Sequence, residues 1–190
     1  MNKPRLYIIA GCNGAGKSTA SISILPRVLK CLEFVNADEI AKGLSPLNPS
    51  EVAIEAGRLM LQRVEELLDQ RATFAIETTL ATRSYKRLVY RAHELGYRVL
   101  LLFFWLPSPE VAQQRVAARV ASGGHNIPSD VIHRRYWLGI RNLFSIFVPI
   151  VDRWSLYDNS IFLQPVVERG IVRDKQKFNQ ILNSCPKKTK

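Results

Sequence analysis

The segment GCNGAGKST, from Gly11 to Thr19, carries the residue types that hold a polyphosphate. It satisfies the pattern Gly-x-x-x-x-Gly-Lys-Ser/Thr. Glycines let backbone N–H groups turn toward an anion, the lysine amine reaches the β- and γ-phosphates, and the following hydroxyl ligates Mg²⁺. We therefore expect ATP or GTP to bind here with Mg²⁺. The predicted nucleotide-binding residues are Gly11, Cys12, Asn13, Gly14, Ala15, Gly16, Lys17, Ser18 and Thr19.

Two predicted elements flank this loop and must position it. The apolar run RLYIIA before it is typical of a strand, and KSTASISIL after it is typical of a helix. A helix that begins at the end of the loop adds the positive end of its dipole to the anion site. This order of strand, loop and helix favours phosphate binding over a glycine loop without function.

Two acidic residues follow predicted strands farther along the chain. Asp38 follows FVNA, and Glu77 follows FAI. Ligands of open α/β sheets bind beyond the carboxyl ends of the strands, so both residues should lie near the phosphate loop. We predict that Asp38 is the general base that accepts a hydroxyl proton. We predict that Glu77 holds Mg²⁺ with Ser18, directly or through water, or contacts the acceptor. The structural alternatives are a helix N-cap for Asp38 and a hydrogen-bonded carboxylate for Glu77, and Asp158 is predicted to be structural.

The chain lacks the sequence motifs of three other classes of nucleotide-binding protein. The apolar strand YRVLLLFFW ends in Leu106-Pro107, whereas a motor ATPase would normally end such a strand in Asp-Glu. The Leu-Ser-Gly-Gly-Gln segment of transporter ATPases is missing, and so is the Asn-Lys-x-Asp segment of GTPases. A phosphate loop with acids on the second and third strands indicates a small-molecule kinase.

Arginines surround a glycine-containing loop in the second half of the chain. Between Val111 and Val151 there are five arginines and one acidic residue, Asp130. We expect a lid over about residues 115–135, in which Ser122–Pro128 closes over the triphosphate and guanidinium groups stabilise the transferring phosphoryl group. The alternative is a solvated basic face. The arginines are Arg115, Arg119, Arg134, Arg135 and Arg141, of which Arg119 and either Arg134 or Arg135 are predicted to be catalytic with Lys17; His125 is a candidate contact to phosphate or substrate.

Composition limits the remaining choices. The chain has 190 residues, 47% of them hydrophobic, which suits one domain over residues 1–185 with a basic tail at 186–190. No apolar run approaches the roughly 20 residues of a membrane span. Three widely spaced cysteines predict reduced thiols and a cytoplasmic location. The net charge of +11 suits nucleic acid or a smaller polyanion.

Strand-like and helix-like segments alternate along the chain. This alternation predicts an α/β fold of the P-loop kinase type, a five-stranded and mainly parallel sheet with helices on both faces and a lid loop. We expect Ser50, Ser108 and Ser129 to be helix N-caps, and the helix after Ser129 to end near Pro149. The expected strands are RLYIIA, LEFVNAD, ATFAIE, YRVLLLFFW, RWSLYDN and FLQPVVE, and the last helix spans about 175–182.

The segments GCNGAGKST, NADEIAKGL, IETTL, RVAARVASGGHNIP, RRY and YDNS, in this order, resemble the zeta-toxin-like kinases. The resemblance covers about Leu6 to Ser160. Zeta toxins are bacterial kinases that phosphorylate a sugar hydroxyl of UDP-N-acetylglucosamine, and a small antitoxin often restrains them. The resemblance implies a UDP-sugar substrate and a possible antitoxin, and the lack of a long apolar run predicts no membrane partner. The resemblance also implies nucleotide and Mg²⁺ contacts at Lys17 and Ser18, the base at Asp38, substrate contacts at Glu77 and Thr79, and phosphate-stabilising roles for Arg119 and either Arg134 or Arg135.

The chain departs from the larger zeta toxins after the Glu-x-Thr segment. Their arginine two residues later is Ala81 here, and Arg83, two residues farther on, is the remaining candidate substrate contact. The alternatives are a polynucleotide or nucleotide-metabolite kinase and a non-catalytic, NTP-regulated RNA-binding protein. The charge of +11 allows nucleic acid as a partner, but no recognition pattern favours it.

Overall fold

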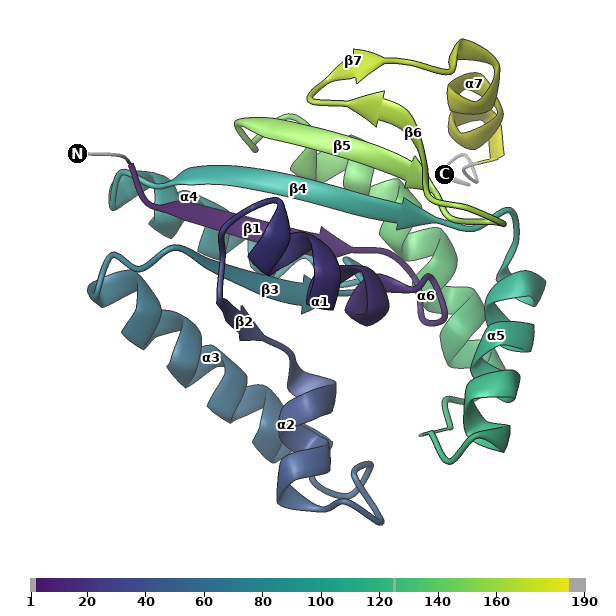
Figure 1. Ribbon diagram of the computed structural model, residues 1–190, viewed down its shortest axis with the longest axis horizontal. Coiled ribbons are helices and arrows are strands. Elements are labelled where there is room, and N and C mark those ends of the chain that lie inside the picture. The colour runs from purple at the N-terminus through teal and green to yellow at the C-terminus, as the bar shows by residue number, and fades with distance from the viewer. Residues whose placement is uncertain (1–2, 125, 185–190) are drawn as a thin grey trace, which may run out of the picture.

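The computed structural model describes residues 3–124 and 126–184, and its strands form one sheet. The sheet order is β2-β3-β1-β4-β5-β6-β7 (Figure 1). The first five strands in this order are parallel, and the last two pairings are antiparallel. The strands are β1 (Arg5–Ala10), β2 (Glu33–Val35), β3 (Phe74–Thr78), β4 (Arg98–Trp105), β5 (Arg153–Asp158), β6 (Gln164–Glu168) and β7 (Ile171–Val172).

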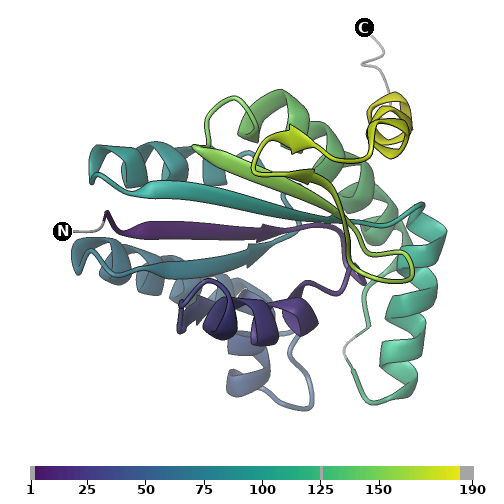
Figure 2. The ribbon, with the colours of Figure 1, turned by 45° about the horizontal axis from the view of Figure 1, so that its top comes forward.

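Helices cover both faces of this sheet. Figure 1 shows α1 in front of the strands, and α4 and α6 behind them. Figure 2 shows α5 beyond the carboxyl ends of the parallel strands. The helices are α1 (Lys17–Arg27), α2 (Ala37–Leu44), α3 (Ala53–Asp69), α4 (Tyr85–Glu94), α5 (Pro109–Ala121), α6 (Ser129–Asn142) and α7 (Lys175–Ser184).

The core lies along the two central strands. In β1 every residue from Leu6 to Ala10 is buried, and in β4 all residues except Arg98 and Leu100 are buried. Continuous apolar runs of this kind are expected where helices cover both faces of a parallel sheet. The predicted α/β fold with a five-stranded parallel core is therefore confirmed, and the antiparallel strands β6 and β7 extend the sheet.

Two of the three predicted N-caps are wrong. The Ser108 hydroxyl accepts a hydrogen bond from the Val111 N–H and caps α5 as expected. The Ser50 hydroxyl instead donates to the side chain of Asn48, and α3 begins three residues later. Ser129 is the first residue of α6, with Pro128 in the cap position, and its hydroxyl accepts a hydrogen bond from Gln113 of α5.

The helix after Ser129 ends close to Pro149, as predicted, but its last turn is of a different type. α6 ends at Asn142 and continues as one π-helical turn, η1 (Leu143–Phe147). The Asn142 side chain donates to the carbonyl oxygen of Leu80, 2.8 Å away, so this end of the helix is fixed to the turn after β3. Within the described ranges, no helix has both the length and the apolar character that a membrane crossing needs.

Candidate active site

The glycine-rich loop after β1 adopts a conformation that requires glycine. Gly11, Gly14 and Gly16 all have positive φ angles, of 140°, 77° and 78°. A Cβ atom at Gly14 would lie 2.7 Å from the carbonyl oxygen of Ala112 in α5, and one at Gly11 would collide with the carbonyl oxygen of Phe104 in β4. Because the loop passes this close to two elements, a side chain cannot be accommodated at either position, and a glycine backbone of this kind is what an anion-binding loop requires.

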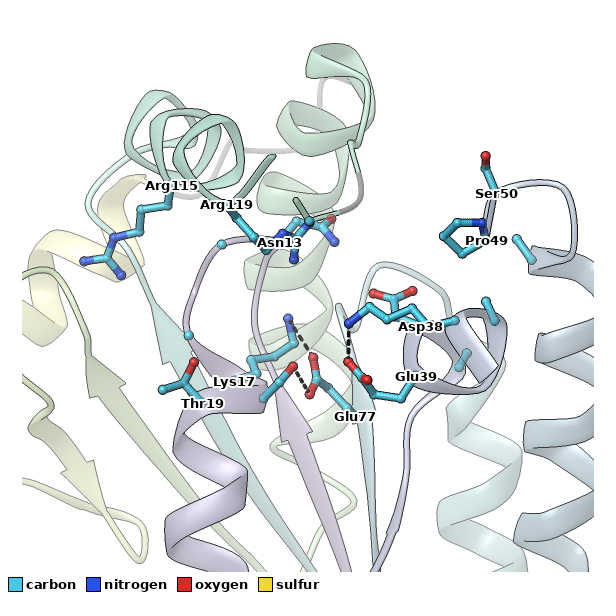
Figure 3. A pocket seen from close by; sticks show the side chains of 18 residues that line it. Asn13, Lys17, Thr19, Asp38, Glu39, Pro49, Ser50, Glu77, Arg115 and Arg119 are labelled. Carbon is cyan, nitrogen blue, oxygen red and sulfur yellow. Dashed lines mark hydrogen bonds and ion pairs between the residues drawn. The ribbon is translucent and has the colours of Figure 1, made fainter. Parts of the chain in front are cut away.

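The side chains of Lys17 and Ser18, at the start of α1, meet Glu77 at the end of β3, and Figure 3 shows Lys17 beside Glu77. The Lys17 amine donates to the carbonyl oxygen of Cys12 at 3.0 Å and lies 3.5 Å from Glu77 Oε1. The Ser18 hydroxyl donates to Glu77 Oε2 at 2.8 Å. The structure therefore brings three of the predicted site residues into one network. Their proximity follows from the parallel pairing of β1 with β3.

Asn36 joins this network, although no motif in the sequence predicted it as a site residue. Its Nδ2 donates to Glu77 Oε2 at 3.0 Å, and its Oδ1 accepts the backbone N–H of Asp38 at 2.8 Å. Asn36 is thus the N-cap of α2, and the structural alternative that made Asp38 the cap is wrong. An asparagine directly before a helical segment was the available sequence signal.

Asp38 lies in the first turn of α2, where two cavities adjoin. The first cavity, of about 400 Å³, lies between the phosphate loop, α2 and α5, and Figure 3 shows Asp38, Lys17 and Glu77 around it. The second, of about 470 Å³, extends toward α3 and the end of β3. Asp38 is an exposed residue, so its carboxylate is accessible from both sides. The two cavities share Asn13, Lys17, Ala37, Asp38 and Glu77.

Three of the five arginines predicted around the lid line a cavity. Arg115 and Arg119 of α5 line the first, although the Arg115 guanidinium donates to the carbonyl oxygen of Ser160 at 2.6 Å and lies apart from that of Arg119 (Figure 3). Arg135 of α6 lines the second and donates to Asn13 Oδ1 at 3.2 Å. Arg134 is exposed and lines neither cavity.

Burial and the nearby Asp38 carboxylate shift the pKa of Arg135 in opposite directions. Desolvation lowers the pKa of the Arg135 guanidinium, the nearby Asp38 carboxylate raises it, and Arg134 lowers it. The guanidinium remains charged at neutral pH, since an arginine pKa is above 12 in its unperturbed state. Placement therefore favours Arg135 over Arg134 as the arginine of α6 that acts in the site.

Of the remaining predicted substrate contacts, one lines a cavity and one does not. Thr79 lines the second cavity. Arg83 lines neither cavity, so the structure does not bring it to the site. His125 and the tail 186–190 lie outside the described residues. A further arginine, Arg58 of α3, lines the second cavity, and no sequence motif pointed to it.

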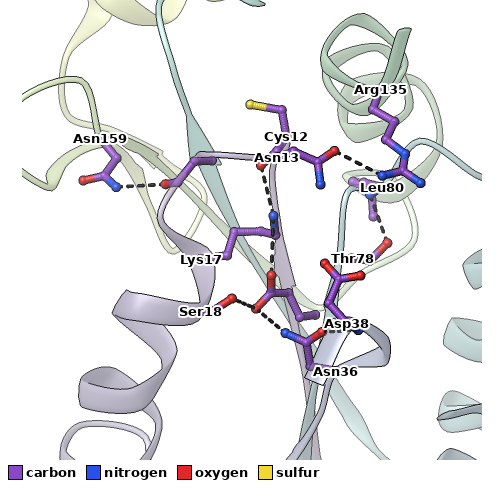
Figure 4. Close-up of polar contacts among 12 residues, drawn as sticks. Cys12, Asn13, Lys17, Ser18, Asn36, Asp38, Thr78, Leu80, Arg135 and Asn159 are labelled. Atoms are coloured by element: carbon purple, nitrogen blue, oxygen red, sulfur yellow. Dashed lines mark hydrogen bonds and ion pairs between the residues drawn. The ribbon is translucent and has the colours of Figure 1, made fainter. Parts of the chain in front are cut away.

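Asn159, immediately after β5, is hydrogen bonded to the phosphate loop. Its Nδ2 donates to the carbonyl oxygen of Ala15 at 2.9 Å, as Figure 4 shows. Asp158 accepts the backbone N–H of Ser160 at 2.9 Å and forms an ion pair of 3.2 Å with Lys177 of α7. Asp158 thus fixes the turn that carries Asn159, which agrees with the structural role expected for it.

Cys12 lies inside the phosphate loop but is chemically protected. Its side chain is buried, and desolvation raises the pKa of the thiol to about 11 despite the opposing charge of Lys17. The thiolate is the reactive form of cysteine, so this thiol is inert at neutral pH. Cys12 and Cys31 are both free cysteines.

The side chains near Lys17 suit a magnesium ion better than a transition metal. Among the described residues there is no group of three or more histidine, cysteine or acidic side chains that could form a metal site. Mg²⁺ is usually held by one or two protein oxygen ligands together with phosphates and water. The Ser18 hydroxyl and the Glu77 carboxylate, 2.8 Å apart, fit that requirement.

Comparison with known proteins identifies relatives of the sequence and of the fold. An uncharacterised protein of Haemophilus influenzae is 33% identical over 135 residues, which cover 71% of this chain and 93% of that protein. The crystal structure of AvrRxo1-ORF1 with ORF2 and ATP superposes with a TM-score of 0.77 at 17% identity. It matches 99% of this chain, which spans 66% of the AvrRxo1 chain.

A second solved structure has the same fold. It belongs to the PezAT chromosomal toxin–antitoxin system of Streptococcus pneumoniae, and it superposes with a TM-score of 0.67 at 17% identity. The match covers 96% of this chain and 84% of that one. At such low identity these structures establish the P-loop kinase-like fold. Residues 6–135, which contain the phosphate loop, Asp38, Glu77, the arginines of α5, and Arg134 and Arg135 of α6, match the AAA domain family, and the chain is a member of that family.

Proposed function

We propose that this protein is a kinase that transfers the γ-phosphate of ATP to a hydroxyl group of a UDP-N-acetylsugar. The observation that carries the proposal is the position of Asp38 where the two cavities adjoin. A phosphate donor in the first cavity and an acceptor in the second would meet beside its carboxylate. Lys17 and Glu77 also line both cavities, so their charged groups lie near the place where the donor and the acceptor would meet.

In this reaction Asp38 accepts the proton of the acceptor hydroxyl while the hydroxyl oxygen bonds to the γ-phosphorus. The bond between the γ-phosphorus and the oxygen that bridges to the β-phosphate breaks, and ADP leaves. Lys17 and the backbone N–H groups of the loop hold the phosphates, and Arg119 and Arg135 supply charge where negative charge develops. Ser18 and Glu77 would hold Mg²⁺, which would supply positive charge to offset the negative charge of the phosphates.

The choice of acceptor is supported by two kinds of similarity. The sequence segments that resemble zeta toxins point to a UDP-N-acetylsugar, and the fold is that of a chain from a toxin–antitoxin system. A structure of the same fold was solved with ATP, which supports ATP as the donor. We infer by the same similarity that a small protein antitoxin restrains the kinase, and that it acts in the cytoplasm, where ATP is available.

Incubation with γ-labelled ATP and UDP-N-acetylglucosamine tests this function. We expect the label on the sugar nucleotide with wild-type protein and no labelled product with Asp38→Asn. Label on an oligonucleotide with a free terminal hydroxyl, and none on the sugar nucleotide, would favour a polynucleotide kinase. Oligonucleotide binding without any turnover of ATP would favour a non-catalytic RNA-binding protein.

A further inference from the structure

The outer wall of the second cavity is one face of α3. Ile54, Arg58 and Leu61 line this wall and follow one another at intervals of four and three residues. Residues at such intervals lie on the same side of a helix. The wall is therefore a continuous stripe in which one cation lies between two aliphatic side chains, and we refer to these three residues as the α3 stripe.

The aliphatic members of the α3 stripe are not part of the core. Ile54 is 76% exposed and Leu61 is 59% exposed. Another side of the same helix is buried through Ala56, Val64 and Leu67. The α3 helix thus presents apolar surface in two directions, and packing within this chain accounts for only one of them. Apolar side chains on the wall of a cavity are the usual way in which a site binds the body of a ligand.

Arg58 is the charged member of the stripe, and it differs from Arg63, the next arginine of α3, in its ion pairs. Arg63 forms ion pairs with Glu33 at 2.9 Å and Glu66 at 3.2 Å. Among the described residues, by contrast, no hydrogen bond or ion pair involves Arg58. Its guanidinium is exposed at the cavity wall and is free to bind an anion.

The charges around the second cavity favour an anionic ligand at the α3 stripe. Its cationic residues are Lys17, Arg58 and Arg135, whereas its acidic residues are Asp38 and Glu77. Glu77 is already hydrogen bonded to Ser18 and Asn36 and pairs with Lys17. Hydroxyl groups, which can donate to an anion or a sugar, lie at the end of β3 and in the loop after it, on Thr78, Thr79, Thr82 and Ser84.

We propose that the α3 stripe recognises the part of the acceptor that does not react. Arg58 contacts an anionic group of the acceptor, a phosphate or diphosphate, and Ile54 and Leu61 pack against a planar or apolar part next to that group. Guanidinium groups bind phosphate oxygens through two parallel hydrogen bonds, so Arg58 would select acceptors that carry phosphate. This inference deepens the proposed function and rests on it, because it assigns the acceptor to the second cavity.

Direct binding and turnover together test the proposal. We would measure binding of UDP-N-acetylglucosamine by calorimetry without ATP, and KM for the same compound in the transfer assay. Arg58→Gln is expected to weaken binding and raise the acceptor KM by about tenfold or more, which is typical of a lost charge-assisted hydrogen bond, and to leave the KM for ATP unchanged. Arg63→Gln is the matched control on the same helix, outside both cavities.

A second pair of variants tests the apolar part of the stripe. Ile54→Ser should weaken binding of UDP-N-acetylglucosamine, whereas Ile22→Ser, at a residue of α1 that is 75% exposed and outside both cavities, should not. N-acetylglucosamine, which lacks the diphosphate, should bind wild type and Arg58→Gln equally weakly. Both comparisons use folded protein, because the substituted side chains are exposed.

Separate outcomes identify which part of the argument fails. Unchanged affinity and KM in Arg58→Gln, or an effect of Arg83→Gln in place of Arg58→Gln, would overturn the assignment of the stripe. A complete lack of binding of UDP-N-acetylglucosamine would overturn it as well. Binding that depends on Arg58 without any phosphoryl transfer would support the stripe and contradict the proposed kinase activity.

Discussion

Lys17 and Glu77, which are 60 residues apart in the sequence numbering, form an ion pair of 3.5 Å beneath the phosphate loop. Their side chains are only 6% and 10% exposed, so this is one of the least solvated charge pairs described in the protein. The pair compensates the lysine charge before any nucleotide binds. A triphosphate must therefore offer the lysine a better partner than Glu77 and the carbonyl oxygen of Cys12.

Replacement of Lys17 by alanine should remove nucleotide binding. The variant loses the amine that would contact the β- and γ-phosphates, and it leaves Glu77 buried without its cation. We expect a loss of ATP affinity of at least about tenfold, and a lower melting temperature, since the removal of one partner of a buried pair is destabilising. Fluorescence titration with a labelled nucleotide and thermal unfolding measure the two effects. Unchanged affinity would contradict the role of Lys17.

Asp38→Asn should separate binding from chemistry. The side chain is exposed, and the cap of α2 is Asn36, so the substitution leaves both the fold and the nucleotide contacts in place. We expect normal ATP affinity and a loss of transfer of about 10²-fold or more, because the amide cannot accept the hydroxyl proton. A loss of nucleotide affinity in the folded variant would show that Asp38 serves Mg²⁺ or the phosphate loop.

Arg119→Ala should lower turnover by about an order of magnitude or more and change nucleotide affinity much less. The reason is that an arginine at the γ-phosphate stabilises mainly the charge that develops in the transition state. Steady-state turnover and ATP affinity, measured on the same protein preparation, test the expectation. An unchanged transfer rate together with weaker oligonucleotide binding would support a nucleic-acid surface and contradict a catalytic lid.

The neighbouring arginines of α6 provide a matched pair. Arg135→Gln should lower turnover by about tenfold or more, because its guanidinium lines the second cavity and bonds to Asn13. Arg134→Gln changes the net charge equally but should leave turnover within about twofold, since it is exposed and lines neither cavity. Equal effects of the two substitutions would show that total charge, and not position, is what matters.

Asn159→Ala should raise the KM for ATP by several-fold without a comparable change in the acceptor KM. The substitution removes the hydrogen bond to the Ala15 carbonyl oxygen, so the phosphate loop loses a contact that holds it to the end of β5. Lys177→Met, which breaks the ion pair with Asp158, should shift the ATP KM in the same direction by less. Lys175→Met, at the start of the same helix, is the control, and a matching shift in that variant would contradict the argument.

The free energy of unfolding should depend on pH through Asp152. Burial raises the pKa of this carboxyl, but the Val99 N–H at 2.7 Å and His93 at 3.0 Å lower it more, so the pKa in the folded protein is below its ordinary value. The ionised Asp152 carboxylate therefore stabilises the fold at pH values above about 3.9, the pKa of an aspartate in the unfolded chain. This stabilisation is lost as the pH falls through the lower pKa of Asp152 in the folded protein.

Asp152→Asn tests this pH dependence. The variant should lose less stability than wild type on acidification from about pH 5 to pH 3, by a difference of less than about 1 kcal/mol because the pair is partly exposed. Urea unfolding at several pH values measures it. Parallel curves for the two proteins would rule out a contribution from Asp152.

The sequence alone determined the phosphate loop and the order of strands and helices. The loop is one contiguous segment whose glycines, lysine and serine act through local backbone geometry, so its residues could be read directly from their spacing. The run YRVLLLFFW likewise indicated a central strand, because burial on both faces requires apolar side chains throughout. Asp38 and Glu77 could be expected near the loop, since parallel strands end at one edge of the sheet.

Only the tertiary structure decided which other side chains reach the site. Arg134 and Arg135 are adjacent in the sequence, yet they point about 100° apart around the helix, and only the packing of α6 sets which one faces the cavity. Arg58 reaches the second cavity because α3 packs against α2, and Asn159 reaches the phosphate loop because β5 pairs with β4. These positions depend on contacts between segments far apart in the chain, and the spacing of residues in a sequence does not encode the angles at which such segments pack.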